Sequence, residues 1–141
     1  MFLYYIGKPR DVHMNRIAEG FVERASRYAP TTMREIRADR ADLHDKHPSA
    51  EHIYLDPGGR TMDSQAFSRI FEKAEMTGRD LVFLVGGADG LPATSLTRCE
   101  AGKGWLLSLS PMTFPHELAR AMLAEQIYRA FAILRGHPYP H

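Results

Sequence analysis

The stretch Leu81–Leu91, with the sequence LVFLVGGADGL, decides the fold of this chain. Its first five residues are all apolar, which is typical of a central parallel strand covered on both faces. The glycines Gly86, Gly87 and Gly90 then predict a tight turn, where the backbone can approach a ligand closely. Their spacing fits neither the dinucleotide-binding glycine motif nor a P-loop. Taken alone, these glycines are explained more simply by a turn between strand and loop.

A second strand end lies downstream, in the sequence LSLSPMTFPH of residues 107–116. A strand expected over Trp105–Leu109 breaks at Ser110, and Pro115 starts a helix, because the first helical turn tolerates proline. A third strand end is expected at Leu55–Gly58. In parallel sheets, ligands bind outside the carboxyl ends of the strands. Three irregular ends of this kind favour an adenosine-type ligand, held by backbone groups and apolar side chains.

The rest of the chain alternates strands with helices. Further strands are expected at Phe2–Ile6, at Met33–Arg37 on a sheet edge, and at His52–Asp56. Helices are expected after a cap at Asp11, from Asp63 or Ser64 to Gly78, over Pro92–Glu100 and over Pro115–Arg135. The first helix has an apolar face of Met14, Ile17, Phe21, Ala25 and Tyr28. This pattern predicts one α/β domain over residues 1–141, with a mostly parallel sheet and helices on both of its faces.

The last of these helices carries a wide apolar band. Its apolar residues are Leu123, Ile127, Phe131 and Leu134 on one face, with Leu118 and Met122 beside them. A band wider than a single core needs is typical of a subunit interface. Deep burial of the helix inside a small domain explains the pattern equally well.

The composition is that of a soluble globular protein, with 44% hydrophobic and 25% charged residues among 141. The single cysteine, Cys99, excludes an internal disulfide and fits a reducing compartment. No apolar run is long enough to cross a membrane, and the apolar start breaks at Gly7 without a basic flank, unlike a signal peptide. We therefore expect a cytoplasmic protein with no membrane partner. The net charge of +1 gives only weak support for nucleic-acid binding, and leaves room for a local basic patch.

The polar stretch Ala38–Ser49 is expected to form a loop with one short helical turn. It contains His44 and His47 close to Asp42 and Asp45, a set of potential metal ligands. Because nothing in the stretch fixes the geometry that zinc needs, a solvated charged loop is the better interpretation. No metal site is expected.

Five motifs occur in a characteristic order: IYLDPGGR (53–60), LVFLVGGADGL (81–91), LSLSPMTFPH (107–116), AEQIYRAF (124–131) and HPY (137–139). Together they resemble the ribosomal RNA large subunit methyltransferase H family, a small branch of the SPOUT methyltransferases. The resemblance covers nearly all of residues 53–139, and Ile6-Gly7-Lys8 also resembles the start of that family.

The resemblance implies a SPOUT-type deep trefoil knot in the C-terminal part, and a homodimer with the last helix in its interface. It implies transfer of a methyl group from S-adenosyl-L-methionine to N3 of a pseudouridine in 23S ribosomal RNA of assembled ribosomes. By match to the motifs, the cofactor-binding residues would be Leu55, Gly86, Leu109, Ser110, Pro111, Met112, Thr113 and Phe114. The catalytic residues near the RNA would be Arg129, His137 and Tyr139, with His116 close by.

These roles suit the side chains concerned. Arg129 can hold a phosphate or stabilise negative charge on the base, and Tyr139 can stack on a base. His137 can take part in proton transfer. Simpler roles are the alternatives: Arg129 as a salt-bridge partner of Glu125 four residues earlier, the two tail residues as a frayed end, and His116 as a local hydrogen-bonding residue.

The sequence departs from the family pattern at two places. The stretch 38–52 is shorter than usual, so that one crossover is expected to be reduced to a loop. Pro140 separates Tyr139 from the terminal His141. The displaced histidine motivates an alternative function, a ribosome-binding protein that keeps the cofactor-binding fold without turnover. A third hypothesis is a nucleotide-binding regulatory module with no RNA partner.

Overall fold

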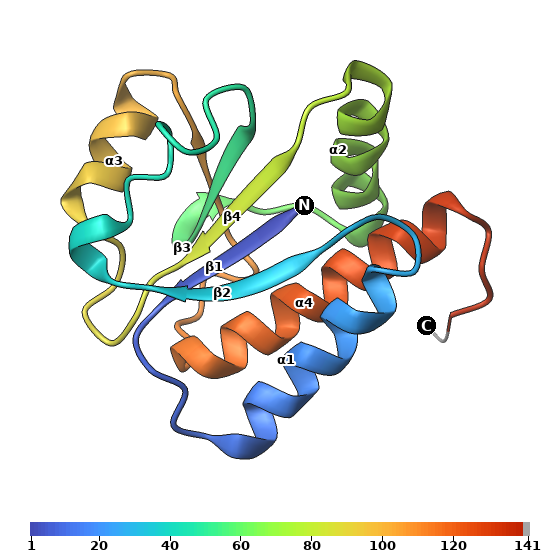
Figure 1. Ribbon diagram of the computed structural model, residues 1–141, viewed down its shortest axis with the longest axis horizontal. Coiled ribbons are helices and arrows are strands. Elements are labelled where there is room, and N and C mark those ends of the chain that lie inside the picture. The colour runs from blue at the N-terminus through green and yellow to red at the C-terminus, as the bar shows by residue number, and fades with distance from the viewer. Residues whose placement is uncertain (140–141) are drawn as a thin grey trace.

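A computed structural model describes residues 1–139 and contains a five-stranded sheet in the order β2-β1-β4-β3-β5 (Figure 1). All four pairs of neighbouring strands are parallel, as predicted. The strands are β1 (Phe2–Ile6), β2 (Thr32–Ile36), β3 (Glu51–Arg60), β4 (Leu81–Val85) and β5 (Trp105–Leu107). The helices are α1 (Val12–Ala25), the 3-10 turn η1 (Ala38–Arg40), α2 (Ser64–Thr77), α3 (Ala93–Glu100) and α4 (His116–Leu134). The predicted α/β class is confirmed.

Strand β4 lies at the centre of the sheet, between β1 and β3, and all five of its residues are buried. Its side chains alternate between two cores, as the period of two in a strand requires. Phe83 and its neighbours on one face pack against α1, α2 and α4. Val82 and Leu84 on the other face pack against Ala41 and Leu43, from the stretch that follows η1. The covered central strand predicted from the sequence is therefore confirmed.

The helix ends follow the predicted caps. Asp11 accepts hydrogen bonds from the backbone N–H groups of His13 and Met14, at 2.9 and 3.1 Å, and so begins α1. Asp63, and not Ser64, is the cap of α2, where its carboxylate accepts from the Ala66 N–H at 2.7 Å. Such side-chain caps replace partners that the first turn lacks within the helix.

The exposed side of α1 differs from the prediction. Ile17 was expected on the buried face, yet 46% of its surface is exposed. The buried residues of the helix are Ala18, Val22 and Ala25. Because two of these are small, α1 can lie close against α4, and the helix turns Ile17 outward.

Strand β3 was predicted to end at Asp56, and β5 at Leu109. Instead β3 continues to Arg60 through an irregular segment, so that both Leu55 and Arg60 lie opposite Leu107 of β5. A Cβ atom on Gly59 would lie 2.6 Å from the backbone of Leu106, so only glycine lets the chain return this close to β5. Strand β5 ends at Leu107, two residues before its predicted end at Leu109.

Helix α4 is packed against both α1 and α2 (Figure 1). It begins at His116, after Pro115 at the cap position, and ends one residue before Arg135. Burial within the chain already accounts for most of the apolar band, including Leu123, Ile127 and Phe131. The partly exposed remainder of the apolar band is Leu118, Met122 and Leu134. The interface and the trefoil knot stay predictions.

The stretch after η1 is the short turn and loop that the sequence predicted. Its charged side chains Asp42, Asp45 and Lys46 are exposed, while Ala41 and Leu43 pack on a sheet face. His44 and His47 make hydrogen bonds with the hydroxyl groups of Tyr54 and Tyr4, at 2.9 and 2.8 Å. Among residues 1–139, no group of three His, Cys, Asp or Glu side chains is arranged to hold a metal ion. No helix in this described part is long and apolar enough to cross a bilayer.

Candidate functional site

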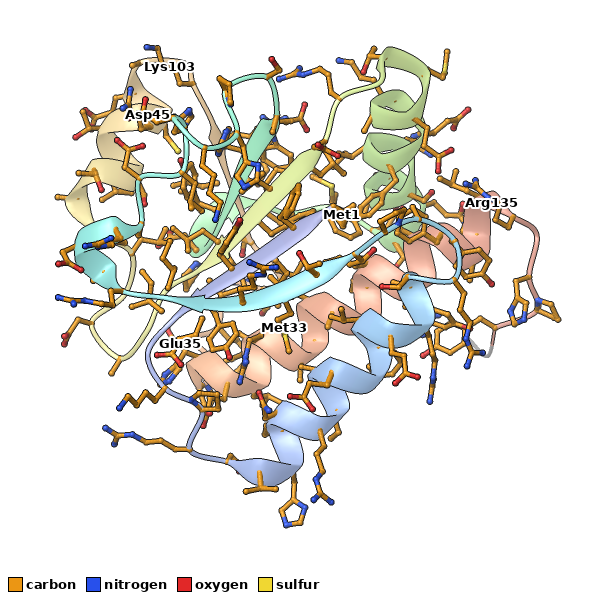
Figure 2. All side chains as sticks on the ribbon, in the orientation of Figure 1. Met1, Met33, Glu35, Asp45, Lys103 and Arg135 are labelled. Carbon is orange, nitrogen blue, oxygen red and sulfur yellow. The ribbon has the colours of Figure 1, made fainter. Side chains whose placement is uncertain are left out.

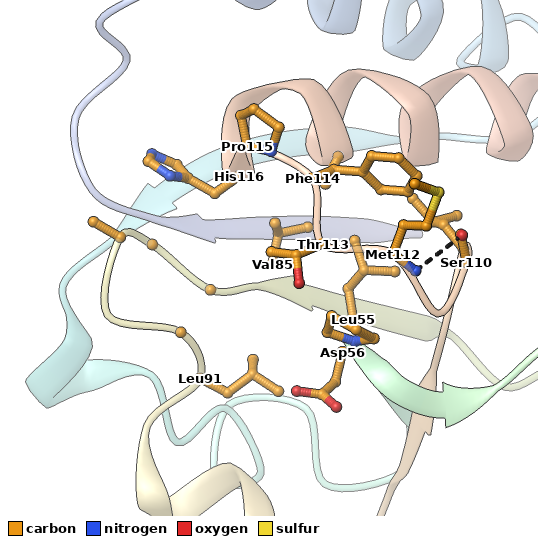
Figure 3. A pocket seen from close by; sticks show the side chains of 17 residues that line it. Leu55, Asp56, Val85, Leu91, Ser110, Met112, Thr113, Phe114, Pro115 and His116 are labelled. Carbon is orange, nitrogen blue, oxygen red and sulfur yellow. Dashed lines mark hydrogen bonds between the residues drawn. The ribbon is translucent and has the colours of Figure 1, made fainter.

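A cavity of about 330 Å³ lies at the carboxyl end of β4, beside the middle of β3, and we call it the carboxyl-end pocket (Figure 3). It is bounded by three segments that are far apart in the sequence: residues 55–57, residues 85–91 and residues 109–116. All of the predicted cofactor-binding residues line it except Pro111. The three segments expected at strand ends do meet, although residues 55–57 lie within β3 and not at its end.

The glycine turn after β4 forms one wall of this pocket. The Gly90 N–H donates to the Gly87 carbonyl at 3.0 Å, and Gly90 has a φ of +78°, which favours glycine. A Cβ atom on Gly86 would lie 2.5 Å from the backbone carbonyl carbon of Gly90. Gly86 is therefore required by the turn itself, rather than only by the approach of a ligand.

A loop between β5 and α4 forms the opposite wall. The Met112 N–H donates to the Ser110 hydroxyl at 3.1 Å, which closes a small turn (Figure 3). The buried Ser108 hydroxyl lies 2.8 Å from the Ser110 carbonyl oxygen and 3.0 Å from the Pro57 carbonyl oxygen. Ser108 thus connects two walls of the pocket. Ser108 was not among the residues predicted to form the site. In the sequence it stands out only as a small polar residue between two leucines.

Asp56 was also missed, although it lies within a quoted motif. Its carboxylate accepts from the Gly58 N–H at 2.8 Å, and its side chain lines the pocket opposite Leu91 (Figure 3). Leu55 and Val85 supply apolar walls nearby. Apolar walls with a few well-placed polar groups are typical of a small-molecule site.

The first turn of α4 is anchored at the edge of this pocket. His116 lines the pocket, while the next residue, Glu117, accepts from the backbone N–H groups of Arg10 and Asp11, at 2.6 and 3.1 Å. The fully buried guanidinium of Arg120 lies 3.7 Å from the same carboxylate and 3.8 Å from the centre of the Tyr5 ring. These contacts fix the helix start, and with it the pocket wall that precedes it.

Two of the predicted catalytic residues lie together near the far end of α4. Arg129 donates from Nε to Glu125 at 2.8 Å, and its guanidinium lies 4.7 Å from the centre of the Tyr139 ring. Tyr139 packs edge-on against Tyr128, also at 4.7 Å. We call these four residues the C-terminal cluster. The hydrogen bond with Glu125 raises the pKa of Arg129, which keeps the guanidinium charged, and burial raises the pKa of Tyr139.

The salt bridge between Arg129 and Glu125, which their four-residue spacing allows, is therefore present. The tail is not frayed as far as Tyr139, because the His137 N–H donates to the Ala132 carbonyl at 2.9 Å. The His137 ring is exposed and packs edge-on near Tyr28, at 6.4 Å between ring centres. The terminal His141 lies outside the described residues.

The carboxyl-end pocket and the C-terminal cluster lie toward opposite ends of α4. Thirteen residues separate His116 from Arg129, which corresponds to about 20 Å of helix at about 1.5 Å per residue. Arg129, His137 and Tyr139 do not line the carboxyl-end pocket, although Leu109 of the pocket and Glu125 of the cluster line a second cavity together.

Comparison with known proteins identifies the family of this chain. Residues 1–141 match the family model described as "Predicted SPOUT methyltransferase". The chain is 61% identical to the ribosomal RNA large subunit methyltransferase H of Solibacter usitatus, over 99% of this chain and 97% of that protein. It is 39% identical to the protein of the same name from Gluconacetobacter diazotrophicus, over 99% and 95% of the two chains.

Solved structures share the fold at low identity. The structure of a probable methylase family protein from Haemophilus influenzae has a TM-score of 0.62 at 10% identity, over 99% of this chain and 70% of that one. A putative RNA methyltransferase from Bacillus anthracis has a TM-score of 0.53 at 18% identity, over 99% and 96%. The match of the family model to residues 1–141 shows that the chain is a SPOUT methyltransferase. Within that class, the chain belongs to the ribosomal RNA large subunit methyltransferase H family.

Proposed function

We propose that this protein is an S-adenosyl-L-methionine-dependent methyltransferase that modifies N3 of a pseudouridine in 23S ribosomal RNA. The observation that carries the proposal is the carboxyl-end pocket, where three motifs shared with the family meet around one cavity. The names of relatives that match the whole chain support ribosomal RNA as the substrate. With assembled ribosomes as the substrate, the enzyme would act in the cytoplasm.

The pocket suits the proposed cofactor. Leu55, Val85 and Leu91 offer apolar surface for an adenine ring, and the glycine turn offers backbone groups. The Asp56 carboxylate suits a ribose hydroxyl or an ammonium group, both of which the cofactor carries. When bound, S-adenosyl-L-methionine supplies a methyl group activated by its positively charged sulfur.

The C-terminal cluster suits the other half of the reaction. The N3 nitrogen of the base bears a proton that must leave, so that negative charge develops on the ring. Arg129 is held by Glu125 and by the Tyr139 ring, and a charged group fixed in advance can stabilise that charge without reorganising. The exposed His137 is positioned in the same tail to accept a proton, and Tyr139 offers an aromatic face for stacking.

These two halves do not line one pocket within a chain, so we propose that they act between two chains. In a homodimer, the cluster of one subunit would complete the pocket of the other. The partly exposed Leu118, Met122 and Leu134 of α4 offer apolar surface for such an interface.

The test uses ribosomes that lack the modification, together with cofactor labelled in its methyl group. We expect label on N3 of one pseudouridine in the large-subunit RNA, and much less label when naked RNA replaces ribosomes. Unlabelled RNA despite cofactor binding and co-sedimentation with ribosomes would instead support the ribosome-binding protein without turnover. Cofactor binding with no co-sedimentation would support the nucleotide-binding regulatory module.

A further inference from the structure

A second cavity, of about 660 Å³, lies at the other end of the sheet, and we call it the amino-end cleft. It is bounded by the starts of β3 and β5, the end of α3 and the loop after η1. Lys103 and Asp45, which both line it, are labelled at the upper left of Figure 2. Five residues of β4 separate this end of the sheet from the carboxyl-end pocket, or about 16 Å.

The amino-end cleft concentrates positive charge in a chain that is nearly neutral overall. Its lining has four basic side chains, Arg60, Arg79, Arg98 and Lys103, against two acidic ones, Asp45 and Glu51. Arg98 is paired with Asp42 at 2.7 Å, and Arg79 donates to the carbonyl groups of Ser49 and Ala50. Within residues 1–139, neither Arg60 nor Lys103 forms an ion pair, and both are exposed.

Arg60 and Trp105 together offer a planar surface. The Arg60 guanidinium lies 4.3 Å from the centre of the Trp105 ring, and Trp105 is partly exposed at the edge of the sheet. Stacks of an aromatic ring and a guanidinium bind unpaired RNA bases, because every base has a flat face.

His52, whose ring stacks on that of His44 at 3.8 Å between ring centres, also belongs to the lining of this cleft. His52 is 3% exposed, and its Nε2 lies 2.8 Å from the carbonyl oxygen of His47, so Nε2 must donate. In the neutral ring, Nδ1 is then an acceptor, and within residues 1–139 it has no hydrogen-bond partner. Because Nδ1 is itself covered, contact with a ligand falls to the exposed side chains of the cleft.

We propose that the amino-end cleft binds an unpaired nucleotide of the ribosomal RNA at a distance from the methylated base. Arg60 and Lys103 hold the phosphate, and Trp105 stacks against the base. This inference rests on the proposed function and extends it to a second RNA contact. Because the cleft lies at the far end of the sheet from the pocket, it contributes to RNA affinity and not to the chemical step.

The first test compares charge reversals with a matched control. Lys103→Glu and Arg60→Glu should each raise KM for unmodified ribosomes about tenfold, with kcat unchanged, because a phosphate contact becomes a repulsion. Cofactor affinity, measured by calorimetry, should stay within twofold. Lys73→Glu makes the same change in net charge on α2, outside the cleft. It should leave KM near that of the protein without a substitution.

The second test uses Trp105 itself, which is the only tryptophan of the chain. A short oligoadenylate should quench its fluorescence, with a weaker effect as salt rises and in Lys103→Glu. An unchanged KM in both reversal variants would overturn the proposal, and so would the absence of quenching. A raised KM without quenching would assign the surface to a ribosomal protein and also overturn it. If the unmodified protein fails to methylate ribosomes, the proposed function fails, while quenching still tests the cleft.

Discussion

The carboxyl-end pocket and the C-terminal cluster are built in different ways. The pocket depends on the path of the backbone: a glycine turn after β4, an irregular segment of β3 and a loop tied down by Ser108. The cluster depends on side chains, with Arg129 held between a carboxylate and an aromatic ring. A site made of backbone suits binding, whereas a fixed charge suits catalysis. The comparison predicts that changes in the two regions will have separable effects.

The largest effect is expected from Gly86→Ala in the pocket. Its Cβ atom would lie 2.5 Å from the Gly90 backbone, so the turn must move and the pocket wall with it. We expect cofactor affinity to fall at least a hundredfold by calorimetry, since the wall and its backbone groups are lost together.

The matched control is Gly20→Ala in α1, where the added Cβ meets no atom within 4 Å. It should leave affinity unchanged and stabilise the helix by up to about 1 kcal/mol. Full cofactor affinity in Gly86→Ala would break the comparison.

Arg129→Ala should produce the opposite pattern. Without the cation in the cluster, kcat for methyl transfer should fall by about a hundredfold or more, in line with the loss of one charge-stabilising group. Cofactor affinity should change by less than twofold, because Arg129 does not line the carboxyl-end pocket. Parallel losses in kcat and in affinity would mean that the residue has a structural role only.

Glu125→Gln gives a smaller effect and tests how Arg129 is held. It removes the charge that pairs with Arg129 at 2.8 Å, while keeping the shape of the side chain. Both partners are mostly buried, so we expect kcat to fall about tenfold and stability by about 1 kcal/mol. If kcat stays unchanged while stability falls, the Tyr139 ring alone is sufficient to position the guanidinium.

The smallest effect is expected from pH. Burial raises the pKa of Tyr139 above that of an unfolded tyrosine. Between the unfolded and the folded pKa the unfolded chain therefore binds fewer protons, and stability falls as pH rises through this alkaline window. Below the unfolded pKa the contribution is fully present. Urea unfolding at pH 8 and above pH 10 should show that Tyr139→Phe loses less stability between the two pH values than the protein with Tyr139 does. An equal loss in the two proteins would assign the effect to other tyrosines.

Features fixed by local chemistry could be predicted from the sequence. Leu81–Val85 is apolar throughout and became the buried central strand, and Asp11 and Asp63 cap helices because their carboxylates reach nearby N–H groups. The residues that line the pocket could be named in advance from the resemblance to the family, whose motifs mark these positions. Of the predicted cofactor-binding residues, only Pro111 does not line the carboxyl-end pocket.

Features that depend on distant contacts could not be predicted. Pro57-Gly58-Gly59 has the composition of a strand end, yet close approach of Gly59 to Leu106 lets β3 continue. Ile17 shares the period of the apolar face of α1, but Ala18 and Ala25 decide which side faces α4. The amino-end cleft draws its residues from separate segments that share no motif, so only the folded chain brings them together.

Subunit complementation tests most directly whether pocket and cluster act together across two chains. Gly86→Ala and Arg129→Ala chains, each inactive as a homodimer, are coexpressed so that about half of the dimers contain one of each. If the cluster of one chain completes the pocket of the other, every mixed dimer has one intact site, and methylation of ribosomes should recover to about a quarter of the unmodified protein's activity. No recovery in verified mixed dimers would contradict this and mean that each chain uses its own pocket and cluster.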